Sequence, residues 1–215
     1  MKTAIIFGST GLIGSQLLNI LLEDNEYSTV RVVVRSPISL THKKLEIVIN
    51  DLTDISTLEK NISGDCCFFC IGTTKSQTSN KSEYRRIEYD IPVLIASIAK
   101  KNNINYFLYV SSLGSNPNTN NIYLKNKGEV EVKLKSLNFK QLSIVKPSIL
   151  LGKRSKFRLV EFLSQRIFIF LSFLFVGPLK KAKPINSKQV AKAMALIAKN
   201  SNSQIIYESD VLQNF

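Results

Sequence analysis

Apolar runs of strand length alternate with stretches of helix length along most of the sequence, and this alternation constrains the fold more than any other feature. The strand-like runs, rich in β-branched and aromatic residues, span 3–8, 29–35, 45–51, 66–72, 105–112 and 142–150. Helical stretches follow at 11–24, 55–62, within 81–103, at 122–137 and at 187–200. Because continuous apolar strands are buried on both faces, we expect a parallel sheet with helices on both sides. Right-handed crossovers then give an α/β, doubly wound, Rossmann-like sheet.

The chain shows no internal repeat and no linker. Its 215 residues suit one domain, so we expect a single unit over 1–215. Fewer residues follow the last strand than a large second domain needs, and we therefore expect 151–215 to form only a small helical cap. The helix at 187–200 begins at Ser187, a candidate N-cap residue.

Residues 166–176, RIFIFLSFLFV, are strongly apolar. They are shorter than the roughly 20 residues that cross a bilayer, so we expect no transmembrane span here. Three interpretations stay open: a buried helix, a wall of a substrate pocket, or a patch that touches a membrane or a partner.

Charge and cysteine content narrow the function classes. The net charge is +13, but the basic residues are scattered, so we expect no nucleic-acid partner, and an anionic ligand would explain part of the charge. Cys66, Cys67 and Cys70 lie in one predicted strand, where Cys67 and Cys70 face opposite ways and form no redox or metal site. The single histidine, His42, lies in a polar loop. Without a secretory signal before the first strand, we expect a reducing, cytoplasmic location.

Three glycines lie between the first strand and the first helix, where a dinucleotide-binding fingerprint occurs. Glycine lets the backbone approach a pyrophosphate, and the free N–H groups and the helix dipole favour the negative charge. The spacing is G-x-x-G-x-x-G. The predicted phosphate loop consists of Gly8, Ser9, Thr10, Gly11, Leu12, Ile13 and Gly14.

The ends of the next strands suggest which dinucleotide binds. Arg35 ends the second strand, where NAD-binding chains usually carry an acidic residue, and an arginine there accommodates the 2′-phosphate of NADP. We therefore expect NADP, with NAD as the weaker alternative. By the same topology, Asp51 and Leu52 would border the adenine. Cys70, Ile71 and Gly72 would pass close to the cofactor.

A serine pair, a tyrosine and a lysine follow the fifth strand in the order VSS and YLKNK, and Tyr123 and Lys127 share one helix face. With FGSTGLIG, NDL, CIGTTK and KPSIL in the same order, the chain resembles the short-chain dehydrogenase/reductase family. The resemblance covers most of the chain and is closest to the atypical branch of the Tat-interacting-protein type.

The resemblance implies an NADP(H)-dependent oxidoreductase that moves a hydride to or from a carbonyl or alcohol. Tyr123 would be the general acid/base, and Lys127 would stabilise its phenolate and hold the nicotinamide ribose. Ser112 would hydrogen-bond the reacting oxygen, with Ser111 as the alternative.

The resemblance implies roles for two further residues, and at one other position this chain differs from many members of the family. Pro147 would flank the nicotinamide, and Arg154 would reach a phosphate or the substrate. Many relatives carry an asparagine in the long helix, whereas this chain has Glu88 near that place, so a proton-relay water would be arranged differently.

Other functions remain open at this stage. A non-catalytic NADP(H)-binding regulatory or interaction protein would use the cofactor as a redox signal and contact its partner through 166–176. A nucleotide-sugar enzyme or an assembly factor is a third possibility. The resemblance implies that the cap over 151–215 lies on the substrate side, and its small size argues against a nucleotide-sugar substrate. The partner is accordingly a small-molecule substrate or a protein, and the chain a monomer or homodimer.

Overall fold

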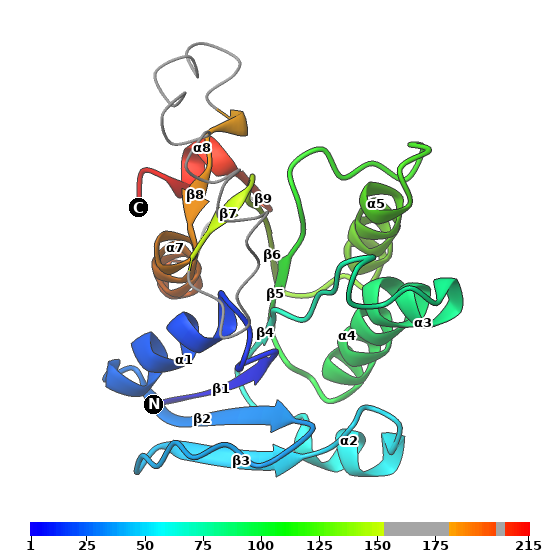
Figure 1. The fold of residues 1–215 in the computed structure, drawn as a ribbon. Coiled ribbons are helices and arrows are strands. Elements are labelled where there is room, and N and C mark those ends of the chain that lie inside the picture. The colour runs from blue at the N-terminus through cyan, green and yellow to red at the C-terminus, as the bar shows by residue number, and fades with distance from the viewer. Residues whose placement is uncertain (153–180, 201–204) are drawn as a thin grey trace.

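The computed structural model describes residues 1–152, 181–200 and 205–215. In this part of the chain, seven parallel strands form one sheet in the order β3-β2-β1-β4-β5-β6-β9 (Figure 1). The strands are β1 Lys2–Phe7, β2 Tyr27–Val34, β3 Leu45–Ile49, β4 Cys66–Phe69, β5 Tyr106–Val110, β6 Gln141–Lys146 and β9 Ile206–Glu208. A separate parallel pair joins β7 Leu150–Leu151 to β8 Ile185–Asn186. The predicted doubly wound Rossmann-like sheet is confirmed.

Helices cover both faces of the sheet (Figure 1). They are α1 Gly14–Glu23, α2 Ile55–Asn61, α3 Lys81–Arg85, α4 Ile91–Lys101, α5 Ile122–Ser136, α7 Ser187–Lys199 and α8 Ser209–Leu212. One core packs α1 and α7 on the sheet, and the other packs α2, α4 and α5 on the opposite face. The leucine stripe predicted for the first helix is buried as expected, at Leu17, Leu18, Leu21 and Leu22.

The cysteines divide between these two cores. Cys67 lies in the core under α4 and α5, whereas Cys66 lies in the core under α1 and α7, against which Cys70 also packs. The predicted opposite orientation of Cys67 and Cys70 is confirmed, because alternate residues of a strand face opposite ways. His42 lies in a loop, as predicted, and its Nδ1 accepts the N–H of Lys44 at 3.2 Å.

We expected both faces of every strand to be buried, but β3 is partly exposed. Ile47 is 40% exposed and Ile49 is 56% exposed. β3 is the last strand on its side of the sheet, so it pairs on one side alone and the helix layers leave much of it uncovered. The apolar run predicted a strand correctly but could not show that the strand lies at an edge.

The stretch 81–103 does not form one regular helix. A π-helical turn, η1 Arg86–Asp90, separates α3 from α4, and the N–H of Ile91 bonds to the carbonyl of Arg86. Pro92 follows directly and has no N–H to donate to the carbonyl of the preceding helical turn. The regular series of α-helical hydrogen bonds is therefore interrupted at this point.

The N-cap residue predicted for the last long helix is wrong by one position. Asn186 is the N-cap of α7, and its side chain accepts the N–H of Lys188 at 2.8 Å. Ser187 is the first helical residue and is buried. Both residue types suit the cap, so composition alone did not separate them.

Most of the described C-terminal residues belong to the main layers of the fold, whereas β8 lies in the separate two-stranded sheet. α7 packs on α1, and β9, which was not predicted, extends the sheet beside β6. Arg154 and 166–176 lie outside the described residues, and the substrate-side cap over 151–215 stays a prediction. Among the helices that the structure describes, none has the length and apolar character needed to cross a membrane.

The buried leucine stripe of α1 supplies a test of the fold. Leu21 is fully buried, so Leu21→Ala removes apolar contacts and leaves a cavity. We expect a loss of about 2–5 kcal/mol in the free energy of unfolding, measured by urea denaturation. Val132→Ala is the control, because Val132 is 56% exposed and its loss should change stability by less than about 0.5 kcal/mol. Equal effects of the two substitutions would contradict this packing.

Candidate cofactor and active site

The glycine loop packs tightly against the end of β4. Gly8 has φ +83°, and a Cβ there would lie 2.8 Å from the carbonyl carbon of Cys70. The N–H of Gly11 donates to the carbonyl of Gly8 at 3.0 Å, and a Cβ on Gly14 would come within 2.1 Å of that same oxygen. Side chains at Gly8 and Gly14 would therefore break the turn that leads from β1 into α1.

The loop has the properties that a dinucleotide pyrophosphate requires. The first turn of α1 contains no acidic residue, and no side chain caps its N-terminal N–H groups. Ser9 is 3% exposed, and its hydroxyl has no hydrogen-bond partner among the described residues. The positive end of the helix dipole and the unpaired Ser9 hydroxyl both favour a phosphate, so these residues fit an NAD(P) pyrophosphate, although the N–H of Ser15 already donates to the carbonyl of Gly11.

The remaining loop residues differ in what they can offer. Thr10 is exposed, and Leu12 is half-buried. Ile13 is 6% exposed and belongs to the core beneath α1, so its backbone alone can face a ligand.

The ends of β2 and β3 lie farther along the same edge of the sheet. Arg35 follows β2 directly and is exposed. Asp51 is exposed and accepts hydrogen bonds from Thr53, which lower the pKa of its carboxyl group. Leu52 has φ +69°, and its N–H donates to the side chain of Asn50 at 2.6 Å.

The loop after β4 connects the glycine loop with α5. The N–H of Cys70 donates to the carbonyl of Phe7 at 2.8 Å, which joins this loop to the end of β1. A Cβ on Gly72 would lie 3.5 Å from Glu88 Oε1 and 3.9 Å from Lys127 Nζ. The structure thus places Gly72 beside Lys127, one of the residues predicted to hold the nicotinamide ribose.

Tyr123 and Lys127 lie one turn apart near the start of α5. Asn121 caps this helix by accepting the N–H groups of Tyr123 and Leu124. Tyr123 is half-buried, and Lys127 Nζ lies 6.0 Å from the centroid of its ring. The N-cap fixes where the helix begins, and therefore which turn carries the tyrosine.

Lys127 is a buried cation. Its Nζ donates to the carbonyl of Val110 at 3.2 Å, pairs with Glu88 Oε2 at 3.1 Å and lies 4.9 Å from the ring centroid of Tyr109. Burial by itself lowers the pKa of this ammonium, but Tyr109 and Glu88 raise it above its ordinary value. Lys127 is therefore charged at neutral pH.

The two serines after β5 have different surroundings. Ser111 is buried, and its hydroxyl donates to Glu131, which also accepts from Ser115 and pairs with Lys146 Nζ at 2.9 Å. The hydroxyl of Ser112 makes a single long contact of 3.4 Å with the carbonyl of Leu113. Ser112 is half-buried and lies outside the Glu131 network.

Backbone bonds join the end of β6 to the same loop. The carbonyl of Pro147 accepts the N–H of Leu113 at 2.9 Å, and the carbonyl of Val145 accepts the N–H of Ser111 at 2.8 Å. Pro147 is buried at this junction.

Sequence reasoning missed several residues that hold the site together. It gave Glu131 no role and noted Glu88 without its contact to Lys127. It included Thr73 and Lys146 only as members of the motifs CIGTTK and KPSIL, without the contacts that they make. Glu131 lies four residues after Lys127, so helical spacing places both on the same face of the helix. This spacing could have indicated from the sequence that Glu131 lies near the site.

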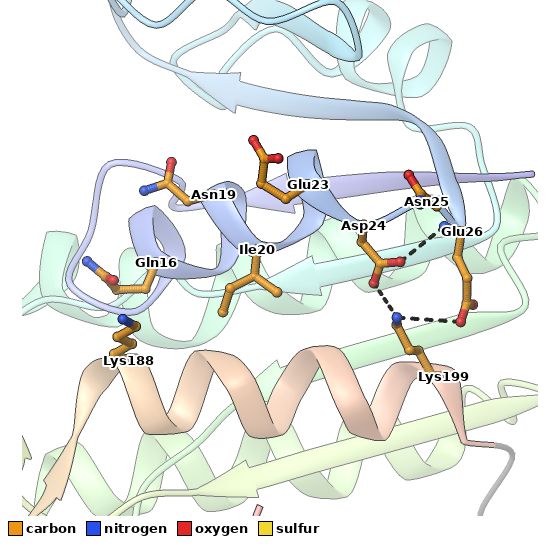
Figure 2. A pocket seen from close by; sticks show the side chains of 9 residues that line it. All are labelled: Gln16, Asn19, Ile20, Glu23, Asp24, Asn25, Glu26, Lys188 and Lys199. Atoms are coloured by element: carbon orange, nitrogen blue, oxygen red, sulfur yellow. Dashed lines mark hydrogen bonds and ion pairs between the residues drawn. The ribbon is translucent and has the colours of Figure 1, made fainter.

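A surface hollow of about 970 Å³ lies between α1 and α7, away from these residues (Figure 2). Lys199 pairs with Asp24 at 2.6 Å and with Glu26 at 3.6 Å at one end of it. None of the predicted site residues lines this hollow, and these ion pairs join α1 to α7.

Comparison with known proteins gives a number of related chains, two of which show the extent of the similarity. The mitochondrial protein FMP52 of Debaryomyces hansenii is 34% identical over 206 residues, which are 94% of this chain and 90% of that protein. Protein HTATIP2 of Rattus norvegicus is 29% identical over 171 residues, which are 78% of this chain and 70% of that protein. The predicted resemblance to the Tat-interacting-protein type is confirmed.

The same comparison corrects one prediction. We expected a cytoplasmic location, whereas the FMP52 relative is a mitochondrial protein. The expectation rested on composition and on the first residues of the chain. Both are weaker evidence for a compartment than a relative of this similarity.

A solved structure and a family model complete the comparison. The Bordetella bronchiseptica enzyme WbmH in complex with NAD+ superimposes with a TM-score of 0.71 at 17% identity, over 97% of this chain and 76% of that one, which shows a shared fold. The family model described as NAD(P)H-binding matches residues 8–200, from the glycine loop to the end of α7. With most of its length matched, the chain belongs to this NAD(P)H-binding family.

Proposed function

We propose that this protein is an NADP(H)-dependent oxidoreductase that acts on a carbonyl or alcohol, with Tyr123 as the general acid/base. The observation that carries the proposal is the position of the buried Lys127 ammonium, one turn after Tyr123 and beside Gly72. The loop of Gly72 also packs against the glycine loop, so the candidate chemical groups and the candidate cofactor loop adjoin.

Each side chain has a distinct part in this function. The Tyr123 hydroxyl gives a proton to the substrate oxygen during reduction and takes it back during oxidation. Lys127 stabilises the phenolate by its charge, and Ser112 donates a hydrogen bond to the same substrate oxygen. The nicotinamide dinucleotide, when bound, supplies or accepts the hydride.

The choice of NADP over NAD is part of the proposal. Arg35 is exposed directly after β2, and no acidic residue follows this strand before Lys43. A carboxylate at this position would repel a 2′-phosphate, whereas a guanidinium binds phosphate through paired N–H groups.

A non-catalytic NADP(H)-binding regulatory protein is the second candidate. The contacts of Lys127 favour it, because Glu88 and the carbonyl of Val110 already engage the ammonium. In this function the cofactor would still bind, and no carbonyl compound would be reduced.

The first prediction for this function concerns Tyr123. Tyr123→Phe removes the hydroxyl that exchanges a proton with the substrate, so we expect turnover of a carbonyl panel with NADPH to fall at least about 100-fold. Binding of NADPH should stay nearly unchanged in calorimetric titration. Calorimetry suits this chain, because it contains no tryptophan to report binding by fluorescence.

The matched control is Tyr89→Phe. Tyr89 stacks under the Arg85 guanidinium at 3.7 Å, and phenylalanine retains this ring. Its turnover should equal that of the wild type. Full activity in Tyr123→Phe would remove Tyr123 from the mechanism. NADPH binding without turnover of any carbonyl in the wild type would favour the regulatory function instead.

The second prediction concerns Arg35. Arg35→Ala should weaken NADPH binding by about 10- to 100-fold, because one charge-assisted contact to phosphate contributes about 1.5–3 kcal/mol. Binding of NADH should change little, since NADH lacks the 2′-phosphate. Lys43→Ala, in the loop that follows β2, controls for a general loss of positive charge. Equal NADPH affinity in wild type and Arg35→Ala would rule out this assignment.

A further inference from the structure

We propose that Glu88 is a positioning residue that holds the Lys127 ammonium and joins it to the loop after β4. This inference rests on the oxidoreductase function proposed above and extends it, because it gives a structural role in that site to Glu88, which stands near the place where many relatives carry an asparagine. It is carried by the contacts of one buried carboxylate with two separate parts of the site.

The carboxylate of Glu88 is completely enclosed, with 0% of its side chain exposed. Oε2 lies 3.1 Å from Lys127 Nζ on α5. Oε1 accepts the N–H of Thr73 at 2.5 Å, directly after Gly72. One side chain thus connects the helix that carries the candidate chemical groups with the loop that packs against the glycine loop.

The surrounding structure gives Lys127 little freedom. The carbonyl of Val110 accepts one N–H of the ammonium, and Glu88 Oε2 lies 3.1 Å from Nζ as an ion-pair partner. Val110 is the last residue of β5, so the pair is fixed to the sheet as well as to the loop. These contacts restrain the ammonium beside Gly72.

Stability alone does not account for a pair of this kind. Removing two charges from water costs several kcal/mol per ion, and the attraction between them often does no more than offset that cost. A buried Lys127–Glu88 pair at the edge where the ligand is proposed to bind is therefore better explained by the geometry that it imposes.

Glu88 also lies at an unusual place in the backbone. It is the third residue of the π-helical turn η1, which packs against α5. π turns are rare and often occur at functional sites.

The other titratable groups around Lys127 come from several elements. They are Tyr84 on α3, Cys70 after β4, Tyr109 on β5 and Tyr123 on α5. Burial raises the pKa of Tyr84 and that of Cys70 to about 12, and it raises that of Tyr109 as well. These three groups are neutral at pH 7, and among the groups around Lys127 named here Glu88 is the carboxyl group that pairs with the ammonium, at 3.1 Å.

The test follows the Lys127 ammonium directly, in protein without cofactor. NMR of 13Cε-labelled lysine reports the protonation of each side chain, and Lys127→Arg identifies the Lys127 signal. We expect the wild-type Lys127 midpoint to lie above that of exposed lysines, near 10.4. In Glu88→Gln it should fall by at least about one pH unit, because burial then acts without the opposing carboxylate.

Glu83→Gln is the matched control. Glu83 lies on α3 and pairs with Arg86 at the surface, so its loss should leave the Lys127 midpoint unchanged. A Lys127 midpoint at or below that of exposed lysines in the wild type would overturn the proposal, and this measurement needs no variant of Glu88. An equal midpoint in wild type and Glu88→Gln would also overturn it.

Hydrogen exchange tests the second contact. Glutamine retains an oxygen that can accept the Thr73 N–H, so this amide should exchange slowly in the wild type and in Glu88→Gln. Glu88→Ala removes the acceptor, and exchange should become at least about tenfold faster. Equal exchange in Glu88→Ala and the wild type would overturn the link to the loop.

Turnover then tests the positioning role. With NADPH and a carbonyl that the wild type reduces, Glu88→Gln should lower kcat by about 10- to 100-fold with little change in NADPH affinity. Glu88→Asp, which retains the charge, should recover part of this loss. Unchanged kcat in Glu88→Gln would overturn the role. If the wild type reduces no carbonyl, the proposed function fails, while the NMR and exchange results still decide whether Glu88 holds Lys127 and the loop.

Discussion

All seven strands of the main sheet run parallel, so their carboxyl ends open on one edge of the molecule. This constraint brings together residues that are far apart in sequence. The sheet reverses its order between β1 and β4, and the loops after these two strands meet there, with Gly8 packed against Cys70. In open α/β sheets this switch point is where ligands bind. The proposed cofactor site thus follows from strand order, and the glycines allow the loops to come close enough.

The second organising element is the face of α5 that turns inward. Tyr123, Lys127 and Glu131 recur at four-residue spacing, and the last two are buried. Each of these buried charges has a partner, Glu88 for Lys127 and Lys146 for Glu131. The first pair adjoins the loop after β4, and the second holds the loop after β5. One helix face therefore positions loops that lie on either side of the proposed substrate position.

Much of this arrangement could be predicted from patterns of residues. The first six strands, the leucine stripe of α1 and the glycine loop are local features, and each has a periodicity or a residue type that a reader can recognise. β9 was missed because its three residues follow a helix without a clear apolar run. The π turn was missed because hydrophobic spacing hardly changes across one turn. The exposed edge of β3 was missed because apolar content does not reveal strand order.

By itself, the sequence determined the fold class, the place of the glycine loop and the position of Tyr123 one helical turn before Lys127, since each depends on residues close together in the chain. The tertiary structure decided which groups meet across the chain. Glu88 contacts Lys127 and Thr73, and Ser111 joins the Glu131 network while Ser112 stays outside it. Such contacts depend on how the helices pack on the sheet and on which buried charges come close to each other. Patterns among neighbouring residues in the sequence do not reveal either.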